Sequence, residues 1–112
     1  SASQMMGEIA SDEARIAVIR SMAAVPEATW RAILECLVTF NRRDDLGAIT
    51  RPVCLIAGAG DGNAPARTMA KMADKLPDAE YHEIEGAGHM INQEAPEETN
   101  AILRAFFERL AK

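Results

Sequence analysis

The sequence contains few aromatic residues, few cysteines and no long apolar segment. Aromatic residues make up 4% of the 112 residues, whereas 48% are hydrophobic and 26% are charged. No apolar run approaches the roughly 20 residues that a membrane-spanning helix needs, and residues 1–4 lack the basic and apolar regions of a signal peptide. This composition predicts one soluble globular domain with a cytoplasmic location, rather than a disordered chain or a membrane protein.

Two further absences exclude classes of binding site. The two cysteines, Cys36 and Cys54, form no CxxC pair, and no His/Cys cluster has metal-ligand spacing. We therefore expect reduced, buried thiols, with no disulfide framework and no metal or cofactor. Lys and Arg are absent from residues 76–103, which carry seven acidic residues, and the net charge of the chain is −5. Because acidic side chains repel phosphate, no nucleic-acid partner is expected.

Hydrophobic spacing predicts an α/β fold with the element order α-α-β-α-β-α. The continuous apolar run at residues 53–57 predicts a strand that is buried on both faces of a parallel sheet, and residues 79–85 predict a second strand. We expect helices at about residues 5–24, 26–40, 65–76 and 96–110. The first is expected to use Ile9, Ile16, Ile19 and Met22 as apolar positions, and the second has an apolar face of Trp30, Ile33, Leu34, Leu37 and Val38.

A sheet of two strands leaves its outer edges unpaired and much of its apolar surface uncovered. The chain is therefore expected to be incomplete by itself. Either further strands come from another part of a parent protein, or copies of this chain pair through their sheet edges.

Two polar side chains are expected where the two strands end. Asp61 lies in the glycine-rich loop after the first strand, and His89 follows Gly-Ala-Gly after the second. Sites in parallel α/β sheets lie beyond the carboxyl ends of the strands. An Asp that accepts a hydrogen bond from Nδ1–H of a His fixes the tautomer and leaves Nε2 free as a general base. Spacing alone leaves open whether Asp61 only forms a turn and His89 is only structural.

The segments around these two residues resemble the C-terminal part of the α/β-hydrolase fold. The resemblance rests on residues 45–53 (DLGAITRPV), residues 56–61 (IAGAGD) and residues 84–89 (IEGAGH), and on the 28-residue interval between Asp61 and His89. It covers roughly residues 28–111. In that family the catalytic triad runs along the chain as nucleophile, acid, histidine.

The resemblance implies that Asp61 is the triad acid and His89 the general base, and that Glu94-Ala95-Pro96 opens the final helix of the fold. Residues 1–45 then correspond to the end of a helical cap, and residues 46–112 to the C-terminal part of the core. The implied parent enzyme hydrolyses an ester or lactone through a covalent acyl-enzyme. Its relatives of this style include the 3-oxoadipate enol-lactonase and haloperoxidase-like branches. Carbon–carbon bond hydrolases, epoxide hydrolases and dehalogenases share the Asp and His signals and are distinguished by the nucleophile, which this chain lacks.

Three other residues have two interpretations each. Trp30 either lines a substrate cavity or packs within a helical hairpin. Met90, beside His89, either touches substrate or fills the turn. His82 is a polar residue within a strand and is not expected to be catalytic.

The sequence departs from the family because it contains no GxSxG nucleophile elbow. Its only serines are Ser1, Ser3, Ser11 and Ser21, and none lies between a strand and a helix. Without a nucleophile and an oxyanion hole, His89 has nothing to activate, so the chain alone is expected to be inactive. The alternative hypothesis is a non-catalytic α/β module that self-associates through its sheet edges, and such a module gives Asp61 no reason to approach His89.

Overall fold

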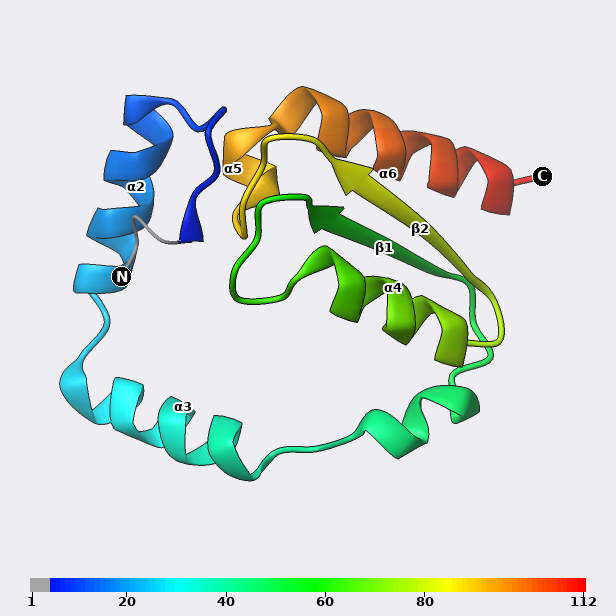
Figure 1. Cartoon of the computed structure of the whole chain (residues 1–112), viewed down its shortest axis with the longest axis horizontal. Helices are drawn as coiled ribbons and strands as arrows, with labels where there is room; N and C mark the ends of the chain where they lie inside the picture. Colours follow the sequence, from blue (N-terminus) through cyan, green and yellow to red (C-terminus); the bar gives the residue numbers. More distant parts are fainter. Residues whose placement is uncertain (1–4) are drawn as a thin grey trace.

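The computed structural model describes residues 5–112 and has the α/β architecture that the sequence predicts (Figure 1). The predicted order of four helices and two strands is confirmed, with two short additions, η1 and α5. The elements are α2 (Asp12–Ala23), α3 (Glu27–Thr39), η1 (Arg43–Ala48), β1 (Val53–Gly58), α4 (Ala66–Lys75), β2 (Ala79–Ile84), α5 (Ile91–Glu94) and α6 (Pro96–Leu110).

The strands β1 and β2 form a parallel pair, which is the only sheet in the described residues. Val53 pairs with Ala79 at one end and Gly58 with Ile84 at the other. The connecting helix α4 and the final helix α6 lie on opposite sides of this pair (Figure 1). The pair and its connecting helix therefore form a βαβ unit, whose carboxyl ends are directed to one edge of the molecule.

The two faces of the sheet are covered by different helices. On the α4 side, the Tyr81 hydroxyl lies 3.0 Å from the carbonyl oxygen of Ala66. On the α6 side, the core is a cluster of Ile84, Ala87 and Ala95, against which Ile56, Ile91 and Ile102 pack. Ile84 and Ala87 are fully buried. This cluster joins the end of β2 to the start of α6, so it fixes the turn that contains His89.

The predicted start of the first helix at about residue 5 is wrong. The helix α2 begins at Asp12, because the Ser11 hydroxyl accepts a hydrogen bond from the backbone N–H of Ala14 at 3.1 Å and caps the helix. The predicted apolar positions are also wrong in part, since Ile16 and Ile19 are half exposed. The buried positions of α2 are Ala14 and Val18, which pack with Met6 in a second small core.

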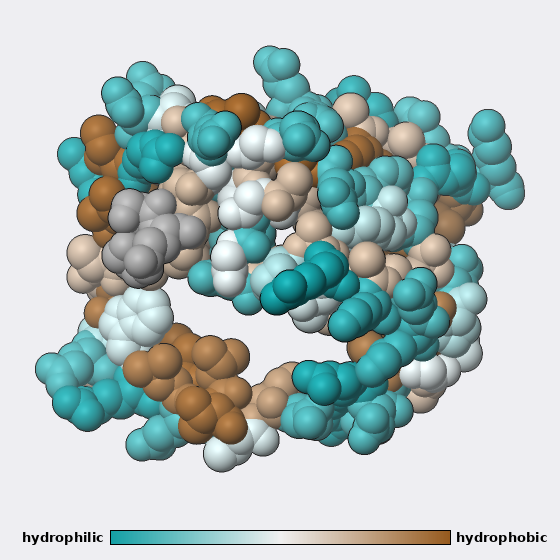
Figure 2. All heavy atoms as spheres, in the orientation of Figure 1, coloured by the Kyte–Doolittle hydropathy of each residue, from teal (hydrophilic) through white to brown (hydrophobic). Residues whose placement is uncertain are grey.

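The helix α3 forms where its spacing predicts, but nothing in the described residues covers its apolar face. None of its residues is buried, and Cys36 is exposed, so the expectation of a buried thiol is wrong there. The exposed fraction reaches 67% at Leu37 and 81% at Val38. Figure 2 shows this hydrophobic surface beside an opening that separates α3 from the βαβ unit. No helix in residues 5–112 is long and apolar enough to cross a membrane.

Candidate functional site

The loop after β1 holds Asp61 in a fixed orientation. The Asp61 carboxylate oxygen Oδ1 accepts hydrogen bonds from the backbone N–H groups of Asn63 at 2.8 Å and Ala64 at 3.1 Å. Its side chain is only 6% exposed. These two bonds form a tight Asx-type turn, which leaves the second carboxylate oxygen, Oδ2, available to another partner.

Backbone contacts join the loops that follow β1 and β2. The N–H of Ala59 donates to the carbonyl of Ile84 at 3.0 Å, and the N–H of Gly60 donates to the carbonyl of Ala87 at 2.9 Å. A side chain at Gly58 would overlap the backbone of the second loop at Ala87 and Gly88, so glycine allows this close approach. The two loops therefore form one rigid rim at the carboxyl ends of the strands.

Asp61 and His89 meet on this rim. His89 Nδ1 lies 2.8 Å from Asp61 Oδ2, although the residues are 28 positions apart in the sequence. Burial raises the pKa of Asp61, but hydrogen bonds from His89, Ala64 and Asn63 outweigh it, so the net pKa is lowered and the carboxylate stays ionised. The His89 side chain is 37% exposed. An ionised, oriented acid against the Nδ1 of an accessible imidazole is the arrangement that leaves Nε2 available for proton transfer.

Glu94 supports the His89 loop in a way that the sequence analysis did not foresee. This residue is 7% exposed. Its carboxylate accepts hydrogen bonds from the N–H of Gly88 and the N–H of Met90, each at 2.9 Å, and also from the N–H of Gly7. A buried carboxylate that is bonded on both sides of His89 holds that backbone in place. In the sequence, the only indication of this supporting role was the position of Glu94 between the His89 loop and Pro96.

Trp30 and Met90 have packing contacts in the described residues. The Trp30 indole N–H donates to the carbonyl of Met22 at 3.3 Å and so ties α3 to the end of α2. Met90 packs against the cluster that contains Met6 and Val18.

A groove of about 820 Å³ lies between the helix α4 on one side and η1 with the residues just before it on the other. Its lining includes Phe40, Arg43 and Leu46 on one side and Lys71 and Met72 on the other. Neither residue of the Asp61–His89 pair lines it, so this groove is separate from the candidate site.

One group of side chains has the donor types of a metal site, contrary to the expectation from spacing. Cys54, Glu80 and His82 each offer one ligand atom, and these atoms lie within 4.8 Å of one another. The sequence analysis missed the group because its members come together only through the pairing of β1 with β2. The sequence signal for this group was that Glu80 and His82 are two residues apart in a predicted strand, which places both side chains on the same face.

Known proteins resemble this chain in sequence and in fold. The sequence profile of the alpha/beta hydrolase family matches residues 3–102. BpoC of Mycobacterium tuberculosis, assigned as a non-heme bromoperoxidase, is 35% identical over 77 residues, which make up 69% of this chain and 29% of BpoC. The crystal structure of BpoC matches with a TM-score of 0.77 and 26% identity, covering 96% of this chain and 42% of that chain.

Two further relatives are named as hydrolases. RutD of Caulobacter vibrioides, assigned as a carbamate hydrolase, is 29% identical over 83 residues, which make up 74% of this chain and 31% of RutD. The crystal structure of MGS-MChE2, an alpha/beta hydrolase enzyme from a lagoon-sediment metagenome, matches with a TM-score of 0.70 and 29% identity, covering 76% of this chain and 39% of that chain.

This chain spans less than half the length of each of these relatives. The family profile nevertheless covers most of the chain, and the shared fold includes β1, β2 and the helices around them. The resemblance inferred from the segments around Asp61 and His89 is therefore confirmed, and the chain belongs to the alpha/beta hydrolase family.

Proposed function

We propose that this chain supplies the acid and the histidine of a nucleophile–acid–histidine triad that hydrolyses an ester or lactone. The observation that carries the proposal is the 2.8 Å contact between His89 Nδ1 and Asp61 Oδ2 at the carboxyl ends of neighbouring parallel strands. A module with only a structural role gives no reason for a buried, ionised carboxylate to meet a partly exposed imidazole there.

The geometry defines a role for each group. Asp61 accepts the hydrogen bond of Nδ1–H, which keeps the proton on that nitrogen and leaves the Nε2 lone pair as the base. Nε2 takes the proton of the nucleophile as the nucleophile attacks the substrate carbonyl, and it then returns that proton to the leaving alcohol. Asp61 stabilises the imidazolium that exists between these two steps.

The nucleophile and the oxyanion hole belong, in this proposal, to an N-terminal part of a parent protein. Residues 1–45 form the end of its cap, and residues 46–112 form the end of its core. Trp30 and Met90 are proposed to contact the substrate in addition to their packing contacts. The chain by itself is then an inactive portion of a hydrolase, since no residue in it sits in a nucleophile elbow.

Ester, lactone and carbamate hydrolysis share an attack on a carbonyl carbon, and the name of RutD supports this reaction class. The resemblance of residues 56–61 and 84–89 to small ester and lactone hydrolases favours these two substrates. Neither a metal nor a cofactor takes part in the proposed steps.

A chimera tests the proposal directly. This chain would replace the structurally matching part of BpoC, and hydrolysis of p-nitrophenyl acetate and of a simple γ-lactone would be measured. We expect turnover by the chimera and none by the isolated chain. His89→Gln and Asp61→Asn should each lower kcat by about 100-fold or more, whereas Asp78→Asn, an exposed residue between α4 and β2, should leave kcat unchanged.

Circular dichroism and thermal melting would establish that each chimera is folded. A folded chimera whose turnover is unaffected by His89→Gln would contradict the proposed role. Turnover by the isolated chain that His89→Ala abolishes would reveal a nucleophile within the 112 residues.

A second candidate function is self-association without catalysis, and one observation favours it. The apolar face of α3 is exposed, and both outer edges of the two-stranded sheet are unpaired within the described residues. Copies that pair through these surfaces would bury apolar area that one copy leaves in water.

A further inference from the structure

The sheet face that packs toward α6 carries an unusual set of side chains near the amino ends of the strands. Cys54 pairs in register with Glu80, and His82 is two residues further along β2, so all three side chains emerge on one face. The same face is apolar at Ile56 and Ile84. Removing polar side chains from water costs free energy unless they gain partners. A thiol, a carboxylate and an imidazole grouped beside apolar residues therefore call for an interaction that compensates this cost.

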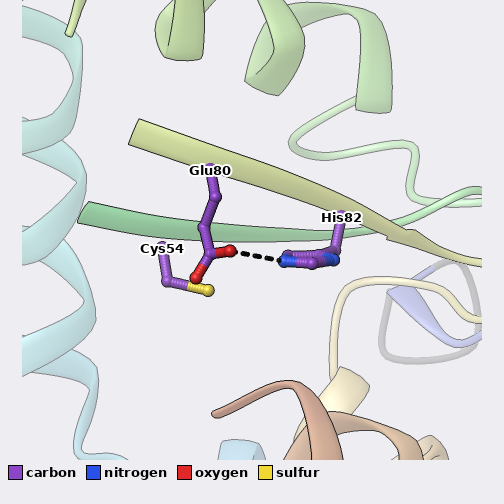
Figure 3. Close-up of side chains that lie close together, drawn as sticks. All are labelled: Cys54, Glu80 and His82. Atoms are coloured by element: carbon purple, nitrogen blue, oxygen red, sulfur yellow. Dashed lines mark ion pairs between the residues drawn. The ribbon is translucent and has the colours of Figure 1, made fainter. Parts of the chain in front are cut away.

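The three side chains point toward one another. In Figure 3 the Glu80 carboxylate lies between the sulfur of Cys54 and the ring of His82. The ligand atoms lie within 4.8 Å of one another, and His82 Nε2 is 3.3 Å from Glu80 Oε2. Metal–ligand bonds of about 2.0 to 2.1 Å in a tetrahedron separate the ligand atoms by about 3.4 Å. The imidazole and the carboxylate are therefore as close as two ligands of one ion, although the oxygen at 3.3 Å is Oε2 and the oxygen left without a partner is Oε1.

Two ligand atoms at this place are buried without a hydrogen-bond partner in the described part of the chain. They are Glu80 Oε1 and His82 Nε2. The approach of Nε2 to Oε2 is within ion-pair range but does not meet hydrogen-bond geometry. A buried polar atom without a partner costs about 1 to 3 kcal/mol. The carboxylate oxygen has free lone pairs, and the imidazole nitrogen has one when it carries no proton. One cation bound by both atoms would therefore satisfy both.

We propose that Cys54, Glu80 and His82 bind one Zn²⁺ ion between β1 and β2. Thiolate sulfur, imidazole nitrogen and carboxylate oxygen are the ligands that zinc takes in proteins, and water would complete the tetrahedron. Glu80 binds through Oε1. Its other oxygen, Oε2, keeps its contact with Arg109 of α6, which orients the carboxylate.

The thiol of Cys54 would lose its proton on binding the ion. Burial raises the pKa of Cys54, the charge of Glu80 raises it further, and Arg109 lowers it. The thiol is therefore protonated without metal. Zinc binding breaks the S–H bond and releases one proton to the solvent as the S–Zn bond forms, so the added cation is partly neutralised by the new thiolate.

The position in the fold assigns a stabilising role to the ion. Cys54 and Glu80 lie at the second positions of their strands, whereas Asp61 and His89 follow the opposite ends. The ion therefore takes no part in the proposed hydrolysis. It links β1 to β2 where neither strand has another neighbour in the described residues, and it anchors α6 through Glu80 and Arg109.

The chain offers matched controls for a test, because it contains two cysteines and two histidines. The metal-free, reduced 112-residue chain would be titrated with Zn²⁺ in competition with a chromophoric chelator, and with Co²⁺ to record the thiolate-to-cobalt absorption. We expect one ion per chain, a thiolate band and a higher Tm with metal. Cys54→Ser, Glu80→Gln and His82→Gln should each weaken zinc binding by more than about 100-fold, since even outer partners cost 10–100-fold.

Cys36→Ser and His89→Gln serve as controls and should leave the zinc affinity and the cobalt band unchanged. Circular dichroism of each metal-free variant would show that it is folded. The proposal is overturned by the absence of one-to-one binding, by a ratio of one ion to two chains, or by loss of the cobalt band in Cys36→Ser rather than in Cys54→Ser. Loss of binding in His89→Gln alone would instead assign the metal to the Asp61–His89 rim.

Discussion

The ionised Asp61 carboxylate links the candidate site to the stability of the fold. Its pKa is lowered because the hydrogen bonds from His89, Ala64 and Asn63 outweigh the effect of burial. A carboxyl group with a lowered folded-state pKa stabilises the fold above its unfolded pKa of about 3.9. That stabilisation is lost as the pH falls through the folded-state pKa. The site therefore contributes to folding at neutral pH and not in acid.

This contribution predicts how Asp61→Asn changes the free energy of unfolding. At neutral pH the variant should be less stable by about 1 to 2 kcal/mol, because a hydrogen bond to a charged group is replaced by a neutral one. The difference should shrink as the pH falls below about 4. Urea unfolding at several pH values measures it, and the exposed Asp78→Asn is the control. A difference that stays constant down to pH 2 would contradict the ionised state of Asp61.

Tyr81 reports on the packing of α4 against the sheet. Burial, the hydrogen bond to Glu83 at 2.6 Å and the negative charge of Glu83 together raise the pKa of its hydroxyl to about 12, and burial is the largest of the three causes. Because it is the only tyrosine, its phenolate absorbance can be followed directly. A raised tyrosine pKa stabilises the fold below the unfolded value of about 10, and this contribution is lost as the pH rises through the folded value.

We therefore expect the phenolate of the folded chain to titrate with a midpoint near 12. Glu83→Gln should lower the midpoint by removing a charge, while burial should keep it above 10. Glu85→Gln, an exposed position after β2, should have no effect. A midpoint near 10, with circular dichroism still that of the folded chain, would mean that α4 does not bury the hydroxyl.

The functional roles of residues were predictable where the sequence pattern and the sheet topology point to the same site. Asp61 and His89 stand in glycine-rich loops after the two strands, and the general position of sites in α/β sheets pairs them. Glu94 was not predictable as a loop support, because its partners are backbone N–H groups that have no sequence signature. Cys54 and His82 were missed because only the register of β1 and β2 brings them together.

At the scale of elements, the start of α2 depends on one hydroxyl. Ser11 caps the helix by accepting a hydrogen bond from the N–H of Ala14. The negative charges of Asp12 and Glu13 in the first turn interact favourably with the positive end of the helix dipole. Ser11→Ala should destabilise the chain by about 1 kcal/mol. Ser21→Ala, an exposed change within the same helix, should be neutral or slightly stabilising. Thermal unfolding of both variants makes the comparison, and equal stabilities would mean that the cap does not form.

The strands and three of the four helices were predicted to within one residue at each end, whereas the start of the first helix was not. The apolar run of β1 begins directly after Pro52, and the strand ends at Gly58, the first glycine of the following loop sequence. The apolar residue Ile9 instead continues the spacing of the first helix back across Ser11, and spacing cannot distinguish a capped start from a longer helix. The short helix α5 is too brief to produce a period, so it was not predicted.

At the scale of the molecule, α3 presents an exposed apolar face. Its exposed large side chains are Ile33, Leu34, Leu37 and Val38, with Phe40 directly after the helix. Figure 2 shows a hydrophobic patch over α3 beside the opening in the molecule. Contiguous apolar patches of this kind mark contact surfaces in soluble proteins. The family relatives are more than twice as long as this chain, so a further part of a parent protein is one candidate partner and a second copy is another.

The isolated chain should therefore self-associate, because it lacks any other partner in solution. Light scattering is expected to give the mass of a dimer or a larger assembly. Leu37→Glu and Val38→Glu introduce charge at the most exposed apolar positions of α3 and should shift the mass toward that of one chain. Glu35→Gln, on the same helix, should leave the assembly unchanged. A folded monomer at all concentrations would show that α3 stays in water without a partner, and retention of the assembly in both Glu variants would assign association to the sheet edges.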